Sequence, residues 1–237
     1  MAKKTKDSKL SIEERLEQAL IPNWDEPYKL PENWCWTKIG VITELYRGVS
    51  YKKHEGHFEK GINDCLVMRG GNIQEGEIDT DADNIYVDKK LVSEEQYVKK
   101  HDIVIVSSTG STKVIGRAGI SFADYDDVAF GAFLTLVRPN KSVHKPYVSY
   151  YFQGDMYRNR MRQLASGVNI NNIRNDYITE TPIPLPPLNE QKRIVSHIEA
   201  FFAKLNEAKE KAQEIVDGFE TRKAAILQKA FSGELTA

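Results

Sequence analysis

The sequence is short of the residues on which several classes of protein depend. Only two residues are cysteines, Cys35 and Cys65. That is too few for a disulfide framework or a thiolate metal site, and it is typical of a reducing cytoplasm. No apolar run reaches the ~18 residues of a membrane-spanning helix. The basic first residues are not followed by the apolar core of a secretory signal. These absences favour a cytoplasmic, globular protein.

Motifs for nucleotide, metal or catalytic chemistry are also missing. Residues 108–113, STGSTK, lack the earlier glycine of a P-loop. Residues 54–57, HEGH, do not have the helical spacing of a zinc site. Asp79, Asp81 and Asp83 alternate without the glycine and glutamate of a calcium loop. No nucleophile–base set and no methyltransferase cofactor loop stands out. The sequence therefore predicts no metal, no cofactor of its own and no catalysis.

The net charge is close to zero, because the sequence contains 33 basic and 34 acidic residues. A protein that binds nucleic acid through bulk charge is not expected from this balance. The charges are unevenly distributed, however. Residues 75–102 contain nine acidic residues and four lysines, whereas residues 105–123 and 156–175 contain basic residues and no acid. This pattern allows one basic face on the folded chain.

The sequence divides into three parts, and its middle part, residues 37–182, is predicted to be an α+β domain. Short β-branched runs separated by Gly, Asp and Asn indicate strands at residues 64–73, 84–88, 101–111, 114–122 and 132–139. Helices are expected at residues 93–100 and 145–166, the second ending at Gly167. The aromatics of the second stretch are expected in the core.

The N-terminal part, residues 1–36, is predicted to contain a short helix and then an extended aromatic segment. Ser11 and Glu14 form a capping box, and prolines end the helix at Pro22. Trp24, Tyr28, Trp34 and Trp36 follow. Aromatics so dense in a loop usually attach it to a core or to a partner.

The C-terminal part, residues 183–237, begins with the proline-rich stretch IPLPPL, a stiff extended hinge. A helix over residues 190–231, roughly 60 Å long, is predicted to follow and to end at Gly233. Its apolar residues recur every three and four positions, which is typical of a coiled coil. This seam comprises Ile194, Ile198, Phe201, Leu205, Ala208, Ala212, Ile215 and Phe219.

Such a stripe is longer than a domain of ~145 residues can cover. Exposed in water it would promote aggregation, so a second helix is expected to pack against it. The partner helix belongs either to another chain, in a homodimer, or to a second half of a longer chain.

Several segments resemble the specificity (S) subunits of type I restriction–modification systems. The most specific are IPLPPLNEQKRIV at residues 183–195 and AILQKAFSGEL at residues 225–235. The N-terminal ERL and PENW, at residues 14–16 and 31–34, also match the family. In the middle part, RGGNI, STGS and SGVN resemble landmarks of its target recognition domain. The resemblance covers essentially the whole chain.

The resemblance implies that the middle part is a target recognition domain that reads one half of a split site in double-stranded DNA. The long helix is then a spacer and the docking site for methyltransferase (M) subunits. These subunits carry S-adenosylmethionine and modify adenine, and restriction (R) subunits are optional further partners. Family members usually hold two recognition domains and two helices, whereas this sequence has one of each.

Polar residues in turns are the candidate DNA contacts, because Arg, Lys, Asn, Ser and Thr bind base edges and phosphates. The candidates are Arg47, Lys52, Lys53, Arg69, Asn72, Thr109, Ser111, Lys113, Arg117, Asn169, Asn171, Asn172 and Arg174. The group at residues 47–53 is alternatively a solvated loop, and Arg69 and Asn72 alternatively only shape a turn. Of the helical arginines at 158, 160 and 162, one or two are expected to face solvent.

Two other functions remain open on the sequence. One is a coiled-coil adaptor that dimerises and binds protein without reading DNA, and the other is a self-sufficient enzyme. Enrichment of a DNA sequence from a random pool distinguishes a reader from an adaptor.

Overall fold

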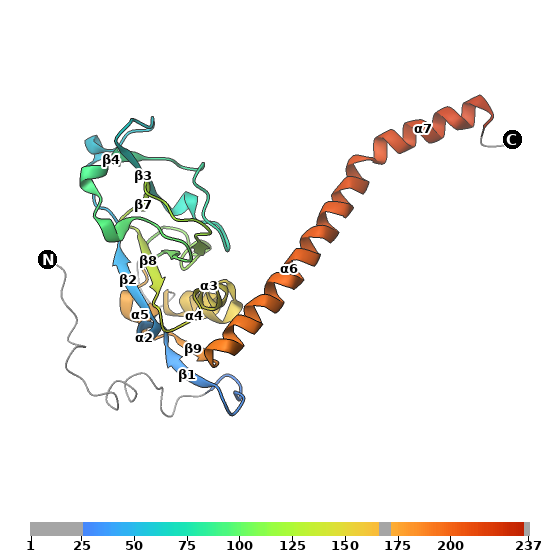
Figure 1. Cartoon of the computed structure of the whole chain (residues 1–237). Coiled ribbons are helices and arrows are strands. Elements are labelled where there is room, and N and C mark those ends of the chain that lie inside the picture. Colours follow the sequence, from blue (N-terminus) through green and yellow to red (C-terminus); the bar gives the residue numbers. More distant parts are fainter. Residues whose placement is uncertain (1–25, 166–171, 235–237) are drawn as a thin grey trace, which may run out of the picture. The chain divides into compact units, whose positions relative to one another are not determined.

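The computed structural model of the chain describes residues 26–165 and 172–234 (Figure 1). The chain divides into two compact units, Met1–Lys192 and Arg193–Ala237. The first unit contains β-strands and short helices, and the second is helical. The predicted α+β class, with a β-rich body followed by a long helix, is confirmed.

The centre of the first unit is a four-stranded antiparallel sheet in the order β2-β8-β5-β6. Its strands are β2 (Thr43–Arg47), β5 (Ile103–Val106), β6 (Ala118–Ile120) and β8 (Leu134–Pro139). The β-branched runs that indicated strands supply β5 and β8, both almost wholly buried. Because β8 lies antiparallel to both β2 and β5, those two strands end at the same edge of the sheet.

A second sheet has the order β4-β3-β7. Its strands are β3 (Asp64–Met68), β4 (Tyr86–Asp88) and β7 (Val128–Phe130), with β3 parallel to β7. Alternate residues of β3 and β7 pack against alternate residues of β5 and β8 in one core, which includes Met68, Val104, Val106, Phe130 and Leu136. The period of two in each strand therefore buries one face of each sheet against the other.

Two proline residues lie in the third sheet, which pairs β1 (Cys35–Lys38) with β9 (Pro182–Leu185). The extended conformation expected for the proline-rich hinge is found, but the segment is paired with a strand and is not a free linker. A two-stranded sheet tolerates proline because each strand has an unpaired side. Tyr147 and Tyr151 donate to the carbonyls of Pro184 and Pro182, at 2.7 and 2.5 Å.

The short helices of the first unit are α2 (Ile39–Ile42), α3 (Lys145–Gln153), α4 (Asp155–Ala165) and α5 (Asn175–Thr179), with 3-10 turns at Lys53–Glu55, Gly70–Asn72, Lys89–Leu91 and Glu94–Gln96. The single helix predicted over residues 145–166 is wrong, since Gly154 is extended and separates α3 from α4. The helix predicted over residues 93–100 is only a 3-10 turn, because eight residues rarely sustain an isolated helix. Gly167 lies outside the described residues.

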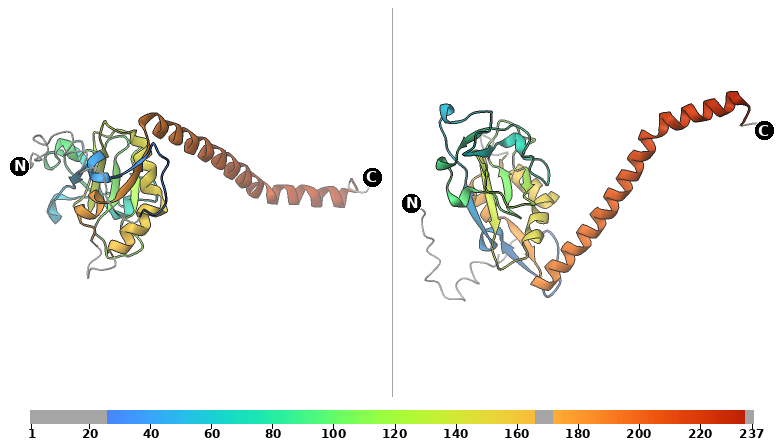
Figure 2. Two further views of the ribbon diagram at one scale, coloured as in Figure 1. Left: turned by 90° about the horizontal axis from the view of Figure 1, so that it is seen from below. Right: turned by 45° about the horizontal axis from the view of Figure 1, so that its top comes forward.

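Aromatic residues of α3 and α4 fill the core as expected. Phe152 and Tyr157 are fully buried, with ring centroids 4.6 Å apart, and Tyr147 is nearly so. Figures 1 and 2 show α3 and α4 beside the strands of the first unit, with β1 and β9 at the opposite end from β3 and β4.

The first turn of α6 (Leu188–Asp217) is anchored through Gln191, whose side chain is buried. Its amide donates to the carbonyl of Pro186, and its oxygen accepts from the backbone N–H of His144, both at 2.8 Å. A glutamine buried with both ends satisfied fixes the rotation of this turn. Gln191 of the segment IPLPPLNEQKRIV therefore has a structural role.

The helix predicted over residues 190–231 is two helices, α6 and α7 (Phe219–Ser232), joined at Gly218 (Figure 1). Backbone hydrogen bonds continue through the junction, because Gly218 donates to Glu214 and accepts from Arg222. The junction is therefore a bend in a continuous helix. It lies at a glycine, which has the lowest helix propensity of any residue except proline. Gly233 ends α7 with a left-handed φ of 81°, which confirms the predicted end.

The apolar seam of this helical unit is open to solvent. Phe201, Leu205, Ile215 and Phe219 are 59–64% exposed, and Ala208 and Ala212 are also exposed. Ile194 and Ile198 are half-buried. No helix in the described part of the chain is long and apolar enough to cross a membrane.

Candidate nucleic-acid interface

Five strand ends meet at the turn between β7 and β8. The backbone N–H of Gly131 donates to Met68 at the end of β3, at 2.9 Å. Val49, just after β2, donates to Phe130 at 2.7 Å. Ser107, just after β5, donates to Phe133 at 3.1 Å. The loops that follow β2, β3 and β5 therefore emerge side by side around residues 131–134.

One close approach fixes this arrangement. A Cβ added to Gly48 would lie 2.1 Å from the carbonyl oxygen of Gly131, so only glycine fits there. Arg47, at the end of β2, is consequently placed next to the turn. Its side chain is exposed.

The loop after β5 carries three predicted contacts, Thr109, Ser111 and Lys113. Thr109 accepts a hydrogen bond from the backbone N–H of Ser111 at 3.2 Å, and this Ser/Thr turn orders the loop. Open space surrounds the Cα of Gly110 between them. Lys113 is exposed. The loop therefore presents hydroxyls, an ammonium group and backbone amides without a covering side chain.

The segment after α4 reaches the same place. Asn172 pairs with Ser108 in an isolated antiparallel bridge, and Ile173 donates to the carbonyl of Ser107 at 2.7 Å. Asn172 is exposed beside the loop. Asn169 and Asn171 lie outside the described residues.

The residues that these loops gather at one edge of the sheets are called the strand-end face below. Its members are Arg47, Arg69, Thr109, Ser111, Lys113, Phe133 and Asn172. Arg69 follows β3, its side chain is 49% exposed, and it forms an ion pair of 2.9 Å with Asp83. Such an exposed pair contributes little stability, so the guanidinium can exchange partners at small cost.

Two predicted contacts form hydrogen bonds to the backbone of neighbouring segments. Asn72 is fully buried, and its side chain accepts from the backbone of Arg69 and donates to the carbonyls of Asp79 and Ala82. The alternative that this residue shapes a turn is the correct one. Arg117 is half-buried and donates to the carbonyl of Ile73 at 3.2 Å. Asn72 is thus fully engaged by the backbone, and Arg117 is engaged through one hydrogen bond.

Three further candidates do not belong to the strand-end face. Lys52 and Lys53 are exposed in the loop between β2 and β3. Farther along this loop, His57 pairs with Tyr86 of β4. Arg174 is exposed but pairs with Asp176 at 2.8 Å. Its guanidinium also lies 4.5 Å from the ring centroid of Tyr177.

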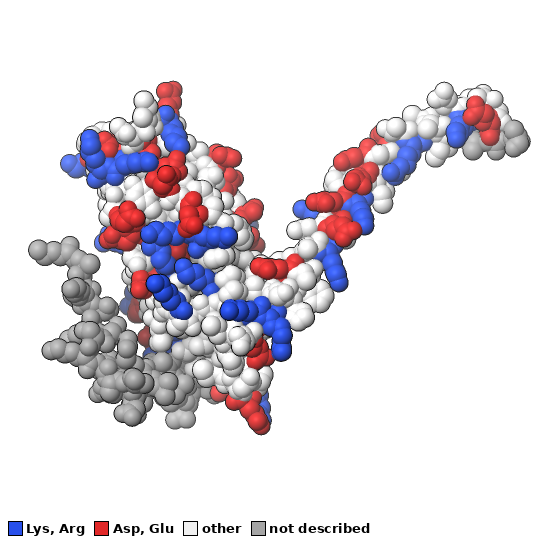
Figure 3. All heavy atoms as spheres, viewed as in Figure 1, with Lys and Arg blue, Asp and Glu red and all other residues white. Residues whose placement is uncertain are grey.

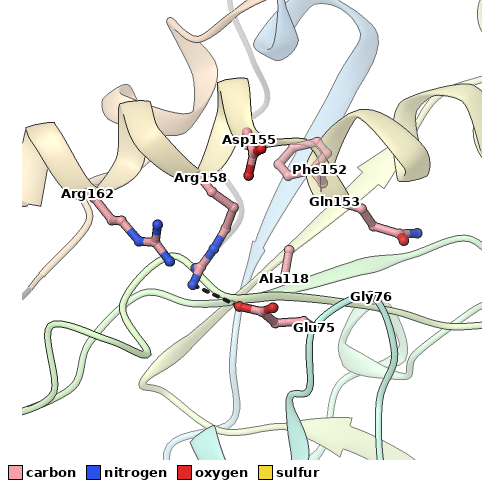
Figure 4. Close-up of a pocket in the computed structure, with 8 residues that line it drawn as sticks. All are labelled: Glu75, Gly76, Ala118, Phe152, Gln153, Asp155, Arg158 and Arg162. Carbon is pink, nitrogen blue, oxygen red and sulfur yellow. Dashed lines mark hydrogen bonds and ion pairs between the residues drawn. The ribbon is translucent and has the colours of Figure 1, made fainter.

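Arg158 is a residue whose role the sequence did not indicate. Its guanidinium is buried and donates to the carbonyls of Ile115 and Lys113, at 3.1 and 3.3 Å. It also pairs with Glu75 at 3.4 Å, as Figure 4 shows. The pKa of Arg158 is lowered mainly by burial and, to a smaller extent, by repulsion from Arg162. Arg158 therefore stabilises the loop that carries Lys113 through hydrogen bonds to the backbone of that loop.

Charge on the first unit is mixed. Figure 3 shows Lys and Arg side chains interspersed with Asp and Glu over the visible face. The described residues contain no group of three His, Cys, Asp or Glu side chains that could hold a metal ion. His57 instead contacts the carboxylate of Asp64 at 2.6 Å, and this hydrogen bond, with one from Gly61, lowers the pKa of Asp64.

The family is decided by a match over residues 31–215 to the type I restriction modification DNA specificity domain. The chain belongs to the type I restriction–modification specificity subunits. It is 36% identical over 213 residues to the EcoKI specificity subunit of Escherichia coli K12. It is 35% identical over 208 residues to the StySPI specificity subunit of Salmonella potsdam.

These two relatives are longer than the chain described here. Each alignment covers 88% of this chain and 44% of the relative, so the chain spans less than half the length of the curated specificity subunits it matches. Among solved structures, the HsdS subunit from Thermoanaerobacter tengcongensis aligns with a TM-score of 0.61 at 22% identity. That alignment covers 92% of this chain and 49% of the HsdS chain, and it supports the fold.

Proposed function

We propose that this specificity subunit reads one half of a bipartite target in double-stranded DNA through its strand-end face. It carries no catalysis itself, and its partner methyltransferase subunits supply S-adenosylmethionine and modify adenine. Restriction subunits are optional further partners in the same complex. The observation that carries the proposal is the gathering of loops after β2, β3 and β5 and the segment at Asn172 around one turn.

Such an arrangement suits base reading. Hydroxyl, amide and guanidinium groups make the hydrogen bonds by which base edges are distinguished, and Lys113 and Arg47 suit phosphates. The loops are attached to a buried core through backbone hydrogen bonds, so binding orders few residues. A weak overall charge is compatible with this mode, since specificity comes from a few placed groups.

The helical unit supports the second half of the proposal. Its exposed seam of Phe201, Leu205, Ile215 and Phe219 calls for a partner helix. We propose that the equivalent helix of a second copy packs there and that the pair docks the methyltransferase. Two reading bodies separated by this pair would contact two half-sites with unread base pairs between them.

The test is selection of duplexes from a random pool by the full chain together with its methyltransferase subunits. The expected result is a split motif with inverted half-sites. The variant T109A/K113A should lose this enrichment, whereas the matched variant K89A/K90A, in the 3-10 turn after β4, should retain it. A failure to enrich any sequence would leave the coiled-coil adaptor as the better function.

Transfer of labelled methyl groups completes the test. The chain alone with DNA and S-adenosylmethionine should show no transfer, and the complex should methylate adenine within the selected motif. Turnover by the chain alone would contradict its assignment as a non-catalytic subunit.

A further inference from the structure

Phe133 is an exposed aromatic residue at the centre of the strand-end face. Its side chain is 71% exposed, although Phe130 and Leu134 on either side are fully buried. It lies in the turn that joins β7 to β8, closed by a hydrogen bond of 2.9 Å from Leu134 to Gly131. Nothing in the packing of the core requires an aromatic side chain at this position.

The backbone of Phe133 is firmly fixed. Its carbonyl accepts from the backbone N–H groups of Ser107 and Ser108, at 3.1 and 3.0 Å. The hydroxyl of Ser107 donates to the same oxygen at 3.0 Å. An apolar side chain on so rigid a support loses little conformational entropy when it meets a partner, because the backbone is already ordered.

The neighbours of Phe133 are polar. Ser108, which donates to it, pairs with Asn172 and precedes Thr109. Met68, which binds the same turn through Gly131, precedes Arg69. A lone aromatic ring among hydrogen-bonding groups is suited to a surface that is mostly polar with one apolar point. The major groove of DNA is such a surface, since the thymine methyl is the apolar group on its base edges.

We propose that Phe133 is a specificity-determining residue that contacts a thymine methyl group in the half-site. The inference rests on the proposed reading of DNA by the strand-end face. It assigns to Phe133 a base contact and not a contact with the phosphate backbone.

The test uses the full chain with its methyltransferase subunits and the target selected from random duplexes. Affinity is measured for the wild type and for Phe133→Ala on every single-base variant of one half-site, and on duplexes with deoxyuridine replacing each thymine. The wild type should prefer thymine over deoxyuridine at one position by about fourfold, which corresponds to burial of one methyl group. The F133A variant should show no preference at that position and unchanged preferences elsewhere.

Phe122→Ala is the matched control. Phe122 is 60% exposed and follows β6, whose end pairs with the start of β5 at the opposite edge of the same sheet. This variant should keep the wild-type preferences. Because Phe133 is exposed, its replacement should also leave thermal unfolding unchanged.

Three results would overturn the inference. They are preferences identical in F133A and wild type, an even loss of affinity at all positions, and a thermal unfolding shift that accounts for the loss. A wild-type complex that selects no sequence would instead contradict the proposed DNA reading itself. The two failures are therefore distinguishable.

Discussion

Replacing Phe201 and Leu205 together by glutamate should dissociate the proposed helix pair. Their side chains are 64% and 63% exposed in the single chain. Full burial of a Phe or Leu side chain contributes ~1.5–3 kcal/mol, so the exposed share of each contributes about 1–2 kcal/mol. Two copies bury four such side chains, which sums to roughly 4–8 kcal/mol. The dissociation constant of the helix pair should therefore rise roughly a thousandfold or more.

Light scattering on the purified chain over a range of concentrations measures this effect. The wild type should have the mass of two copies, and F201E/L205E the mass of one. Glutamate has nearly the helix propensity of leucine, so the helix itself should persist in far-UV circular dichroism. The near-UV spectrum of the first unit should not change.

The control is A203E/N206E, which adds the same charge at positions off the seam. It should retain the wild-type mass. A wild-type chain that is a monomer at all concentrations, or equal masses for the seam variant and the control, would refute the reasoning about the exposed seam.

Three further outcomes are expected. Asp102→Asn should lower the free energy of unfolding by about 3 kcal/mol in urea titrations, because Asp102 is 1% exposed and holds Arg138 at 2.6 Å in a buried pair. Lys113→Gln should weaken DNA binding evenly across sequences and reduce the slope of log K against log salt by about 0.9. Alkylation at pH 8 should label exposed Cys35 and spare Cys65, since burial raises the pKa of the Cys65 thiol to about 12.

Each of these three predictions has a result that would contradict it. Asp176→Asn, at an exposed pair, should change stability by less than about 0.5 kcal/mol, and an equal loss in both variants would contradict the argument from burial. A change in base preference with K113Q would indicate a base contact. The folded Cys65 keeps a proton that the unfolded chain loses above pH ~8.5, so its contribution to stability should fall as pH rises further. Labelling of Cys65 before unfolding would argue against its burial.

The strands and the seam could be predicted because each rests on a local period in the sequence. The β-branched runs fill β3, β5 and β8, and the spacing of three and four residues marks α6. Pairing could not be predicted in the same way. Nothing local to residues 182–185 says that they pair with residues 35–38, since that contact depends on the path of the whole chain.

The candidate site was partly predictable for a similar reason. Polar residues near glycines indicated loops. Exposed Arg47, Arg69 and Lys113 do lie at the end of β2 and in the loops after β3 and β5. The sequence could not distinguish an exposed polar side chain from one that satisfies buried backbone, as Asn72 does. Phe133 was missed because an aromatic residue at the start of a strand is most often core.

The anchoring of Gln191 has a consequence for how such a subunit can acquire a new target. Residues inserted farther along α6, beyond buried Val195, would lengthen the helix and leave these hydrogen bonds in place. Four extra residues advance a helix by about 6 Å and rotate it by about 40°, close to two base-pair steps at about 3.4 Å each. Insertions near one helical turn should therefore widen the unread gap in small steps, so that gap length and base choice can change independently.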